Sequence, residues 1–235
     1  LNMQGVKLLN DGVDINDFKN SFNKTKLTYL IPDFQNPKAT TYSEEKRAQV
    51  ANIIESQNGI LIEDSPYSEL FFEKKEKSIS SRLPKNSFHL GSFSKTLAPS
   101  FRIGWIRADE ELLKPLMIIK ESIDLHSCGV SQYILCEYLK DEKRYENHLQ
   151  NIRDDYKQKA TYFSEQLKQI IPEFEHELPK GGMFLYGNLK GVDSFALVQK
   201  CLEKKVVYVP GNQFYIDKIP NGEIRFNYTH STFEQ

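Results

Sequence analysis

Short apolar runs rich in strand-forming residues recur through the first half of the chain, and each is followed at once by polar residues. The runs lie at 27–31 (LTYLI), 59–63 (GILIE), 87–91 (SFHLG) and 101–107 (FRIGWIR). Residues 42–57 have apolar side chains at helical spacing, with Thr41 or Ser43 available as the cap. This alternation predicts an α/β fold with a mostly parallel sheet, whose strands we expect to be buried on both faces.

The second half of the chain changes its pattern. Helical spacing extends over 110–123, 129–140 and 143–169, and strands are expected at 183–187, 206–209 and 224–228 around a helix at 193–204. We therefore predict that residues 1–142 are part of a large domain and that residues 143–170 form a connecting helix. Residues 171–235 then form a small α+β C-terminal domain. Buried strands need more cover than these elements supply, so we expect a piece of a longer protein, incomplete at both ends.

Charge and composition exclude several classes of function. Lys and Arg total 31 against 32 for Asp and Glu, which gives no overall attraction to nucleic acid or to anionic membranes. No apolar stretch approaches the roughly 18 residues of a membrane span. Cys128, Cys136 and Cys201 lack metal-like spacing and are expected to be free, buried thiols of a reducing compartment. The five histidines also lack such spacing, so we expect a cytoplasmic protein without a metal site.

Polar residues follow three of the predicted strands, at the sheet edge where ligands of such folds bind. They are Asn36 after the first strand, Asp64 and Tyr67 after the second, Ser92, Ser94 and Lys95 after the third, and Arg102 close by. Each one alone has an ordinary explanation as a cap, a turn or a surface charge. Together they suit a phosphorylated aromatic cofactor that contains nitrogen, because a carboxylate can hold a protonated ring nitrogen while hydroxyls and an arginine hold a phosphate.

These residues stand in motifs that resemble a known family. Residues 91–105 (GSFSKTLAPSFRIGW) resemble the Schiff-base lysine segment of fold-type I pyridoxal-phosphate enzymes, above all the class I and II aminotransferases of the 2-aminoadipate and multi-substrate group. Further segments match in the same order at 32–37 (PDFQNP), 63–67 (EDSPY), 179–184 (PKGGMF), 206–211 (VVYVPG) and 224–228 (IRFNY). The resemblance covers about residues 27 to 228. It extends equally to the aminotransferase-like domain of GntR/MocR-type transcription regulators.

The resemblance implies a fold, a cofactor and roles for individual residues. It implies the pyridoxal-phosphate-dependent transferase fold, with pyridoxal 5′-phosphate as cofactor and with Lys95, Asp64 and Tyr67 as catalytic residues. The implied cofactor contacts come from Asn36, Asp64, Tyr67, Ser92, Ser94, Lys95 and Arg102, and the implied substrate contact is from Arg225 to an α-carboxylate. Gly181 and Gly182 are expected to allow close backbone approach near the substrate. The implied partners are an α-amino acid, a 2-oxo acid and a second copy of the chain in a homodimer.

Two features depart from the family pattern or leave the function open. The asparagine loop reads Asn36-Pro37-Lys38-Ala39 where the family usually has Asn-Pro-Thr-Gly, so the turn is expected to differ. In the family the phosphate-binding loop precedes the matched segments, so the chain alone is expected to bind the cofactor weakly or not at all and to be inactive. An aminotransferase is the first hypothesis. The alternatives are the effector domain of a regulator, which would contact nucleic acid only through an upstream winged helix, and another reaction of pyridoxal phosphate.

Overall fold

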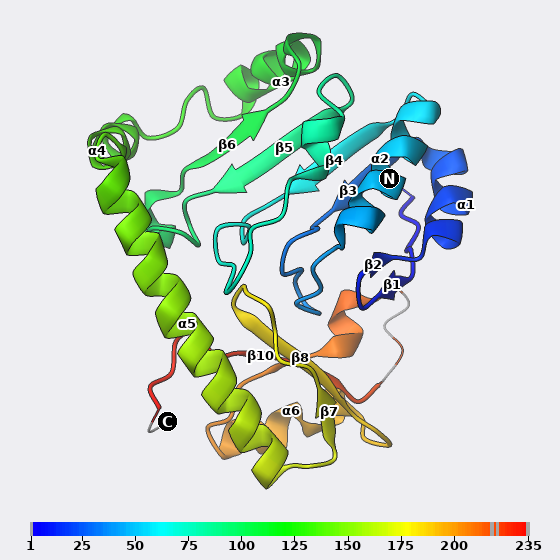
Figure 1. Ribbon diagram of the computed structural model, residues 1–235, viewed down its shortest axis with the longest axis vertical. Helices are drawn as coiled ribbons and strands as arrows, with labels where there is room; N and C mark the ends of the chain where they lie inside the picture. The colour runs from blue at the N-terminus through cyan, green and yellow to red at the C-terminus, as the bar shows by residue number, and fades with distance from the viewer. Residues whose placement is uncertain (1, 217–218, 220, 234–235) are drawn as a thin grey trace.

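Two four-stranded sheets joined by a long helix form the chain (Figure 1). The computed structural model describes residues 2–216, 219 and 221–233. The first sheet contains, in order across it, β3 (Leu27–Leu30), β4 (Ile60–Asp64), β5 (Ser87–Ser92) and β6 (Gly104–Arg107). β3, β4 and β5 run parallel and β6 runs antiparallel to β5. The predicted α/β class with a mostly parallel sheet is therefore confirmed.

Helices cover one face of the first sheet. A hairpin of β1 (Leu8–Leu9) and β2 (Gly12–Val13) leads into α1 (Ile15–Thr25), α2 (Glu44–Ser56) follows β3, and the short helix η1 (Ile79–Arg82) precedes β5. Asp14 caps α1, and Ser43 caps α2 by accepting a hydrogen bond from the Lys46 backbone at 3.2 Å. Phe18, Phe22 and Ile54 pack with Leu61 of β4 in the core between these helices and the sheet.

The other face of the first sheet is open. Tyr29 of β3 is 55% exposed and Ile106 of β6 is 49% exposed. The prediction that the strands are buried on both faces is therefore wrong for this chain, because α1 and α2 pack only on the side of Leu30 and Leu61. The open face is the one that carries Asp64, as described below.

A long helix connects the two sheets. α3 (Glu110–Ile123) and α4 (Gly129–Leu139) follow β6 and lead into α5 (Glu142–Ile170), which runs from the first sheet to the far end of the second (Figure 1). In its first half Arg153 lies over the Phe71 ring at 4.1 Å, and near its end Leu167 packs with Phe174. α5 occupies the segment predicted as a connecting helix. The proposed division of the chain into domains on either side of it stays a prediction.

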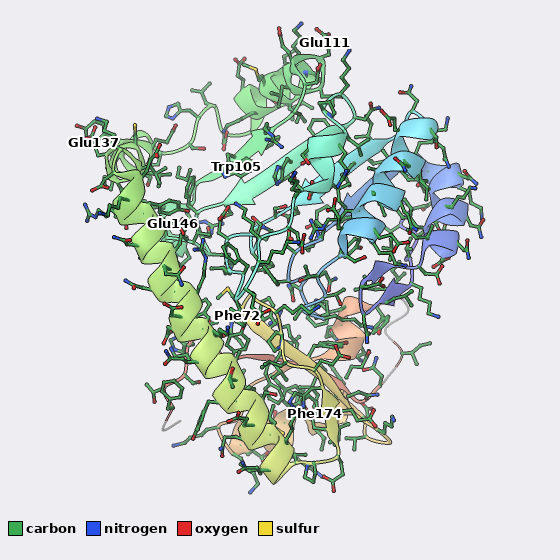
Figure 2. The ribbon with its side chains drawn as sticks, in the orientation of Figure 1. Phe72, Trp105, Glu111, Glu137, Glu146 and Phe174 are labelled. Atoms are coloured by element: carbon green, nitrogen blue, oxygen red, sulfur yellow. The ribbon has the colours of Figure 1, made fainter. Side chains whose placement is uncertain are left out.

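The second sheet is antiparallel throughout. It contains, in order, β7 (Phe174–His176), β8 (Phe184–Leu189), β10 (Glu223–Asn227) and β9 (Val209–Pro210), with α6 (Ser194–Glu203) and the short helix η3 (Gly211–Phe214) between strands. Figure 2 shows Phe174 within this unit, whose core also contains Leu185 and Ile224.

Three predictions about local structure are corrected. Residues 99–101 form a short helix (η2, Pro99–Phe101) and Arg102 has φ 52°, so the predicted strand at 101–107 begins only at Gly104. Most of the strand expected at 206–209 is absent, since β9 holds only Val209 and Pro210. The cysteines are free, as predicted, but they are not buried: Cys128 and Cys136 are exposed and Cys201 is half-buried.

Candidate active site

The carboxyl ends of β3, β4 and β5 lie at one edge of the first sheet, and the loops after them approach the second sheet. In the loop after β4, the Phe72 N–H donates to the Lys180 carbonyl at 3.0 Å, and the Leu70 carbonyl accepts from the Gly182 N–H at 2.9 Å. Figure 2 shows Phe72 of this loop beside the tip that precedes β8. The edge that holds the predicted site residues therefore faces a second structural unit.

Asp64 ends β4 and has a partner that the sequence did not indicate. The Tyr29 hydroxyl donates to Asp64 Oδ2 at 2.5 Å from the neighbouring strand. Tyr29 lies opposite Ile62 in the parallel register, which places it on the same face as Asp64. Burial first, and then the hydrogen bond to Asp64, raises the pKa of Tyr29, so the phenol keeps its proton and remains a donor.

Asn36 and Arg225 meet although 189 positions separate them. Arg225 Nη1, from β10, donates to Asn36 Oδ1 at 2.7 Å. The guanidinium lies 4.3 Å from the Phe184 ring and 5.4 Å from the Phe214 ring. Its Nε is buried and has no hydrogen-bond partner among the described residues. An arginine fork with an unused buried donor is suited to a carboxylate.

Tyr67 lies close to both groups. Its ring is buried edge-on to Phe184, with ring centres 5.7 Å apart. Burial raises the pKa of the Tyr67 phenol, the nearby Arg225 charge opposes this rise, and Asp64 adds to it. Burial likewise lowers the pKa of Arg225, whereas the neighbouring Tyr67 raises it. The structure therefore brings together four of the predicted residues, namely Asn36, Asp64, Tyr67 and Arg225.

The predicted lysine lies in the turn that follows β5. Within this turn the Ser94 N–H donates to Ser92 Oγ at 3.1 Å. From α5, the His148 ring nitrogen Nε2 lies 3.2 Å from the Thr96 carbonyl. Lys95 is half-buried, and its amine has no hydrogen bond or ion pair with any described residue. It therefore sits at the correct end of the sheet with its donors unused.

Arg102 makes its side-chain hydrogen bond within its own short helix. It is exposed, and its Nη1 donates to the Pro99 carbonyl at 3.5 Å. Gly104, two residues later, pairs with Ser92 in the sheet, so Arg102 lies at the same strand end as the lysine turn. Among the described residues, no hydrogen bond joins Arg102 to the other predicted site residues.

A buried arginine supports the asparagine loop and was also missed. The Arg47 side chain is fully buried; it donates to the Pro32 and Tyr42 carbonyls and forms an ion pair with Asp33 at 2.6 Å. These bonds join the two ends of the loop that carries Asn36. Buried charges need such complete pairing, which explains why Arg47 and Asp33 occur together.

The turn of the asparagine loop retains a left-handed residue despite the missing glycine. Ala39 stands at the position where the family has Gly and has φ 55°. Lys38, in place of the usual Thr, reaches the second sheet, with its Nζ 3.8 Å from Glu223. The departure from the family pattern therefore changes the side-chain contacts of the loop while Ala39 adopts the conformation that a glycine would favour.

The two glycines before β8 approach protein rather than open space. Gly182 has φ 77°. A Cβ on Gly181 would lie 2.5 Å from the Leu70 carbonyl and 2.5 Å from the Phe34 ring. The close approach predicted here is therefore accounted for by packing against the asparagine loop and the loop after β4, and a role beside the substrate stays a prediction.

The described part of the chain contains neither a metal-binding cluster nor a membrane-spanning helix. No cluster of three or more histidine, cysteine or acidic residues is placed to ligate a metal ion there. None of the helices described above has the length and apolar character that a bilayer-crossing helix requires.

Comparison with known proteins places the chain among relatives of two kinds. The family model described as aminotransferase class I and II matches residues 9–235. The aromatic-amino-acid aminotransferase 1 of Thermococcus litoralis is 34% identical over 212 residues, which is 88% of this chain and 50% of that protein. The HTH-type transcriptional regulator NorG of Staphylococcus aureus is 32% identical over 215 residues, which is 90% of this chain and 48% of that protein. The chain thus spans about half the length of these curated relatives.

Solved structures give the same result. The α-aminoadipate aminotransferase LysN of Thermus thermophilus, complexed with N-(5′-phosphopyridoxyl)-L-leucine, superposes with a TM-score of 0.91 at 28% sequence identity. The match covers 97% of this chain and 61% of that one. The fold predicted from the resemblance is therefore confirmed.

Proposed function

The chain belongs to the family of class I and II aminotransferases, and from this premise we propose that it transfers an amino group between an α-amino acid and a 2-oxo acid. The proposed cofactor is pyridoxal 5′-phosphate. The observation that carries the proposal is the hydrogen bond of 2.7 Å between Arg225 and Asn36. It joins the proposed substrate-binding arginine of the second sheet to the proposed cofactor-binding asparagine after the first strand of the first sheet.

The groups left unused at this edge fit such a cofactor. The second oxygen of Asp64 is open to a ring N–H, because Tyr29 occupies only Oδ2. Asn36 accepts from Arg225 through its oxygen, which leaves its amide N–H groups to donate to a ring oxygen. The Lys95 amine is unpaired within the described chain. A carboxylate, an amide donor and an amine are the groups that a pyridine nitrogen, a phenolate oxygen and an aldehyde require.

When bound, pyridoxal phosphate supplies an electron sink for the bonding electrons of the substrate Cα. Lys95 Nζ is the proposed base that moves the proton at Cα, a step that its neutral amine would perform, and no hydrogen bond or ion pair with a described residue holds it elsewhere. Asp64 keeps the ring nitrogen protonated, and Tyr67 and Asn36 donate to the ring oxygen. Ser92, Ser94 and Arg102 are the proposed phosphate contacts.

Arg225 is the proposed clamp for the α-carboxylate of the substrate. Its Nη1 is engaged by Asn36, so Nε, which is buried without a partner among the described residues, and Nη2 are available for a two-point contact. The contacts with the Phe184 and Phe214 rings limit the orientations of the guanidinium plane.

The experiment is a half-reaction assay on the full-length protein. The protein is mixed with pyridoxal phosphate, a panel of amino acids is added, and the cofactor absorbance and the production of 2-oxo acid are followed. We expect both to change for at least one amino acid, and to be lost in Lys95→Ala but kept in Lys85→Ala, a matched substitution of an exposed lysine. Equal activity in the two variants would contradict the proposal.

A second candidate is the effector domain of a transcription regulator. It is favoured by the 32% identity to NorG over 90% of this chain. In that case the full-length protein binds the cofactor through the same residues but produces no 2-oxo acid with any amino acid of the panel. DNA binding by an upstream domain would then accompany cofactor binding. The homodimer and the cytoplasmic location remain predictions under either candidate.

A further inference from the structure

The orientation of the Asp64 carboxylate depends on a single residue of the neighbouring strand. The hydrogen bond of 2.5 Å from the Tyr29 hydroxyl engages Oδ2. Among the described residues, Asp64 has no second hydrogen bond and no ion pair with a lysine, arginine or histidine. Tyr29 therefore determines which oxygen of Asp64 is occupied and which one is left open.

The backbone places this pair with little freedom. β3 and β4 are parallel, with Tyr29 opposite Ile62, so the Tyr29 side chain extends along the open face of the sheet towards the carboxyl end of β4. Asp64 stands two residues after Ile62 on that same face. Residues of the two strand backbones, rather than a mobile loop, thus hold both ends of the hydrogen bond.

In this contact the Tyr29 phenol is the donor and the Asp64 carboxylate is the acceptor. A phenol is a donor towards a carboxylate, and a hydrogen bond to the charged form stabilises that form. Both burial and the bond to Asp64 raise the pKa of Tyr29 above its usual value of 10.0, so the phenol does not compete for the negative charge. Among the described residues, this bond is the one side-chain contact that orients the Asp64 carboxylate.

We propose that Tyr29 is a positioning residue that holds the Asp64 carboxylate through Oδ2 and leaves Oδ1 open to the protonated ring nitrogen of the cofactor. The inference deepens the proposed function and rests on it for the identity of the ring. It assigns to Tyr29 a role in stabilising the pair of carboxylate and ring N–H over the neutral pair in which the carboxyl carries the proton. Removing the phenol shifts that proton towards Asp64.

The first test needs no cofactor. The carboxyl carbon signal of Asp64 is measured by carbon NMR of the full-length protein, labelled at aspartate and free of cofactor, with Asp64→Asn used to assign the signal. In Tyr29→Phe we expect this signal to shift, because the carboxylate loses its hydrogen bond from the phenol. Tyr133→Phe removes a phenol that is 68% exposed on α4 and is the matched control. An unchanged Asp64 signal in Tyr29→Phe overturns the proposal.

The second test reads the ring nitrogen directly. The same proteins are loaded with pyridoxal phosphate labelled with ¹⁵N in the ring, and the nitrogen chemical shift is compared. We expect the shift of Tyr29→Phe to move towards that of neutral pyridine, while the wild-type protein and Tyr133→Phe keep that of the protonated ring. Identical shifts in all three proteins overturn the role of Tyr29 and leave the proposed function intact.

The two failures are distinguishable. If the wild-type protein takes up no cofactor, the proposed function fails and so does the part of the inference that concerns the ring. The NMR measurement on the cofactor-free protein still decides whether Tyr29 holds the Asp64 carboxylate. Tyr29 is more than half exposed, so replacing its hydroxyl by hydrogen removes no core packing, and the variant is expected to fold.

Discussion

Arg225 combines a buried, unpaired donor with a partner on the other sheet. Its guanidinium is bonded to Asn36 through Nη1, while Nε stays free among the described residues for the carboxylate that the motif at 224–228 implies. A lysine at this position would keep the charge but lose the planar two-point contact. We expect Arg225→Lys to lower kcat/KM for the amino acid roughly 10- to 100-fold, mainly through KM. Steady-state kinetics check this, with Arg144→Lys on α5 as control, and equal effects of the two changes would contradict it.

Ala39 replaces the usual glycine of the family motif in a backbone conformation that favours glycine. Its φ of 55° is a left-handed conformation that disfavours a residue with a Cβ. Ala39→Gly removes this conflict, although glycine also increases the entropy of the unfolded chain. We expect the substitution to raise the free energy of unfolding by about 0.5–1 kcal/mol. Urea unfolding measures it, and a loss of stability would mean that the turn is not under strain at this residue.

The residues that sequence reasoning missed share one property. Tyr29, Asp33 and Arg47 act on the site through partners far from them in the sequence or through buried bonds that no local motif records. Asn36, Asp64 and Lys95 were predictable because each directly follows an apolar strand pattern. Tyr29 could have been found from the parallel register of β3 and β4, since that register alone brings its side chain to the face of Asp64.

At the scale of elements, prediction succeeded where local signals dominate. The helix at 110–123 was predicted with its observed bounds, since Asp109 caps it and acidic residues occupy its first turn. The observed bounds of strand β9 and the existence of the three-residue strand β7 were not predicted. Such short strands are defined by their pairing, of β9 with β10 and of β7 with β8, rather than by their own composition. The short helix before β6 is a further case, in which a left-handed Arg102 interrupts an apolar run.

The tip before β8 docks on the first sheet's loops through a contact that excludes a side chain. A Cβ on Gly181 would lie 2.5 Å from the Leu70 carbonyl, a distance that requires the backbone to move. We expect Gly181→Ala to lower the free energy of unfolding by about 1–3 kcal/mol. Gly129→Ala on α4 is the matched control, because nothing lies within 4 Å of its Cβ position. Thermal unfolding measures the stability of both variants. Equal stabilities would show that the tip moves to accommodate the added methyl group without cost.

The asparagine loop and α2 are joined by the buried ion pair of Arg47 and Asp33. Arg47→Met leaves the Asp33 charge and the Tyr42 carbonyl without their donor in a buried site, and the Pro32 carbonyl keeps only the Tyr42 N–H. We expect a loss of about 3–5 kcal/mol in the free energy of unfolding. Arg82→Met breaks a more exposed ion pair with Glu44, and we expect less than about 1 kcal/mol. Chemical denaturation compares the two, and a small effect of the Arg47 change would indicate that water replaces its bonds.

For the molecule as a whole, the candidate site depends on two separate sheets that meet along a few contacts. The Asn36–Arg225 bond, the Lys38–Glu223 pair and the packing of Gly181 on Phe34 all cross between them. α5 bridges the same two units and reaches the lysine turn through His148. Most strands and the helix between the sheets were predictable from local patterns, but the relative placement of the sheets is set by these long-range contacts, which no local pattern contains.

Exposed apolar side chains on two consecutive helices lead to a prediction about the behaviour of the chain in isolation. They lie on α3, α4 and the turn between them, and they are Met117, Ile118, Ile119, Ile123, Leu125, Val130, Tyr133 and Ile134. A patch of this extent on a chain of net charge −1 favours association, because little charge repulsion opposes it. We expect the 235-residue chain, produced alone, to self-associate with rising concentration and to bind a hydrophobic dye. Ile123→Lys, at a residue that is 77% exposed, should weaken both effects, whereas Ser122→Lys adds the same charge beside it and should change them less. Light scattering and dye fluorescence measure the two variants, and a chain that stays monomeric and dye-free at high concentration would show that this surface is not adhesive.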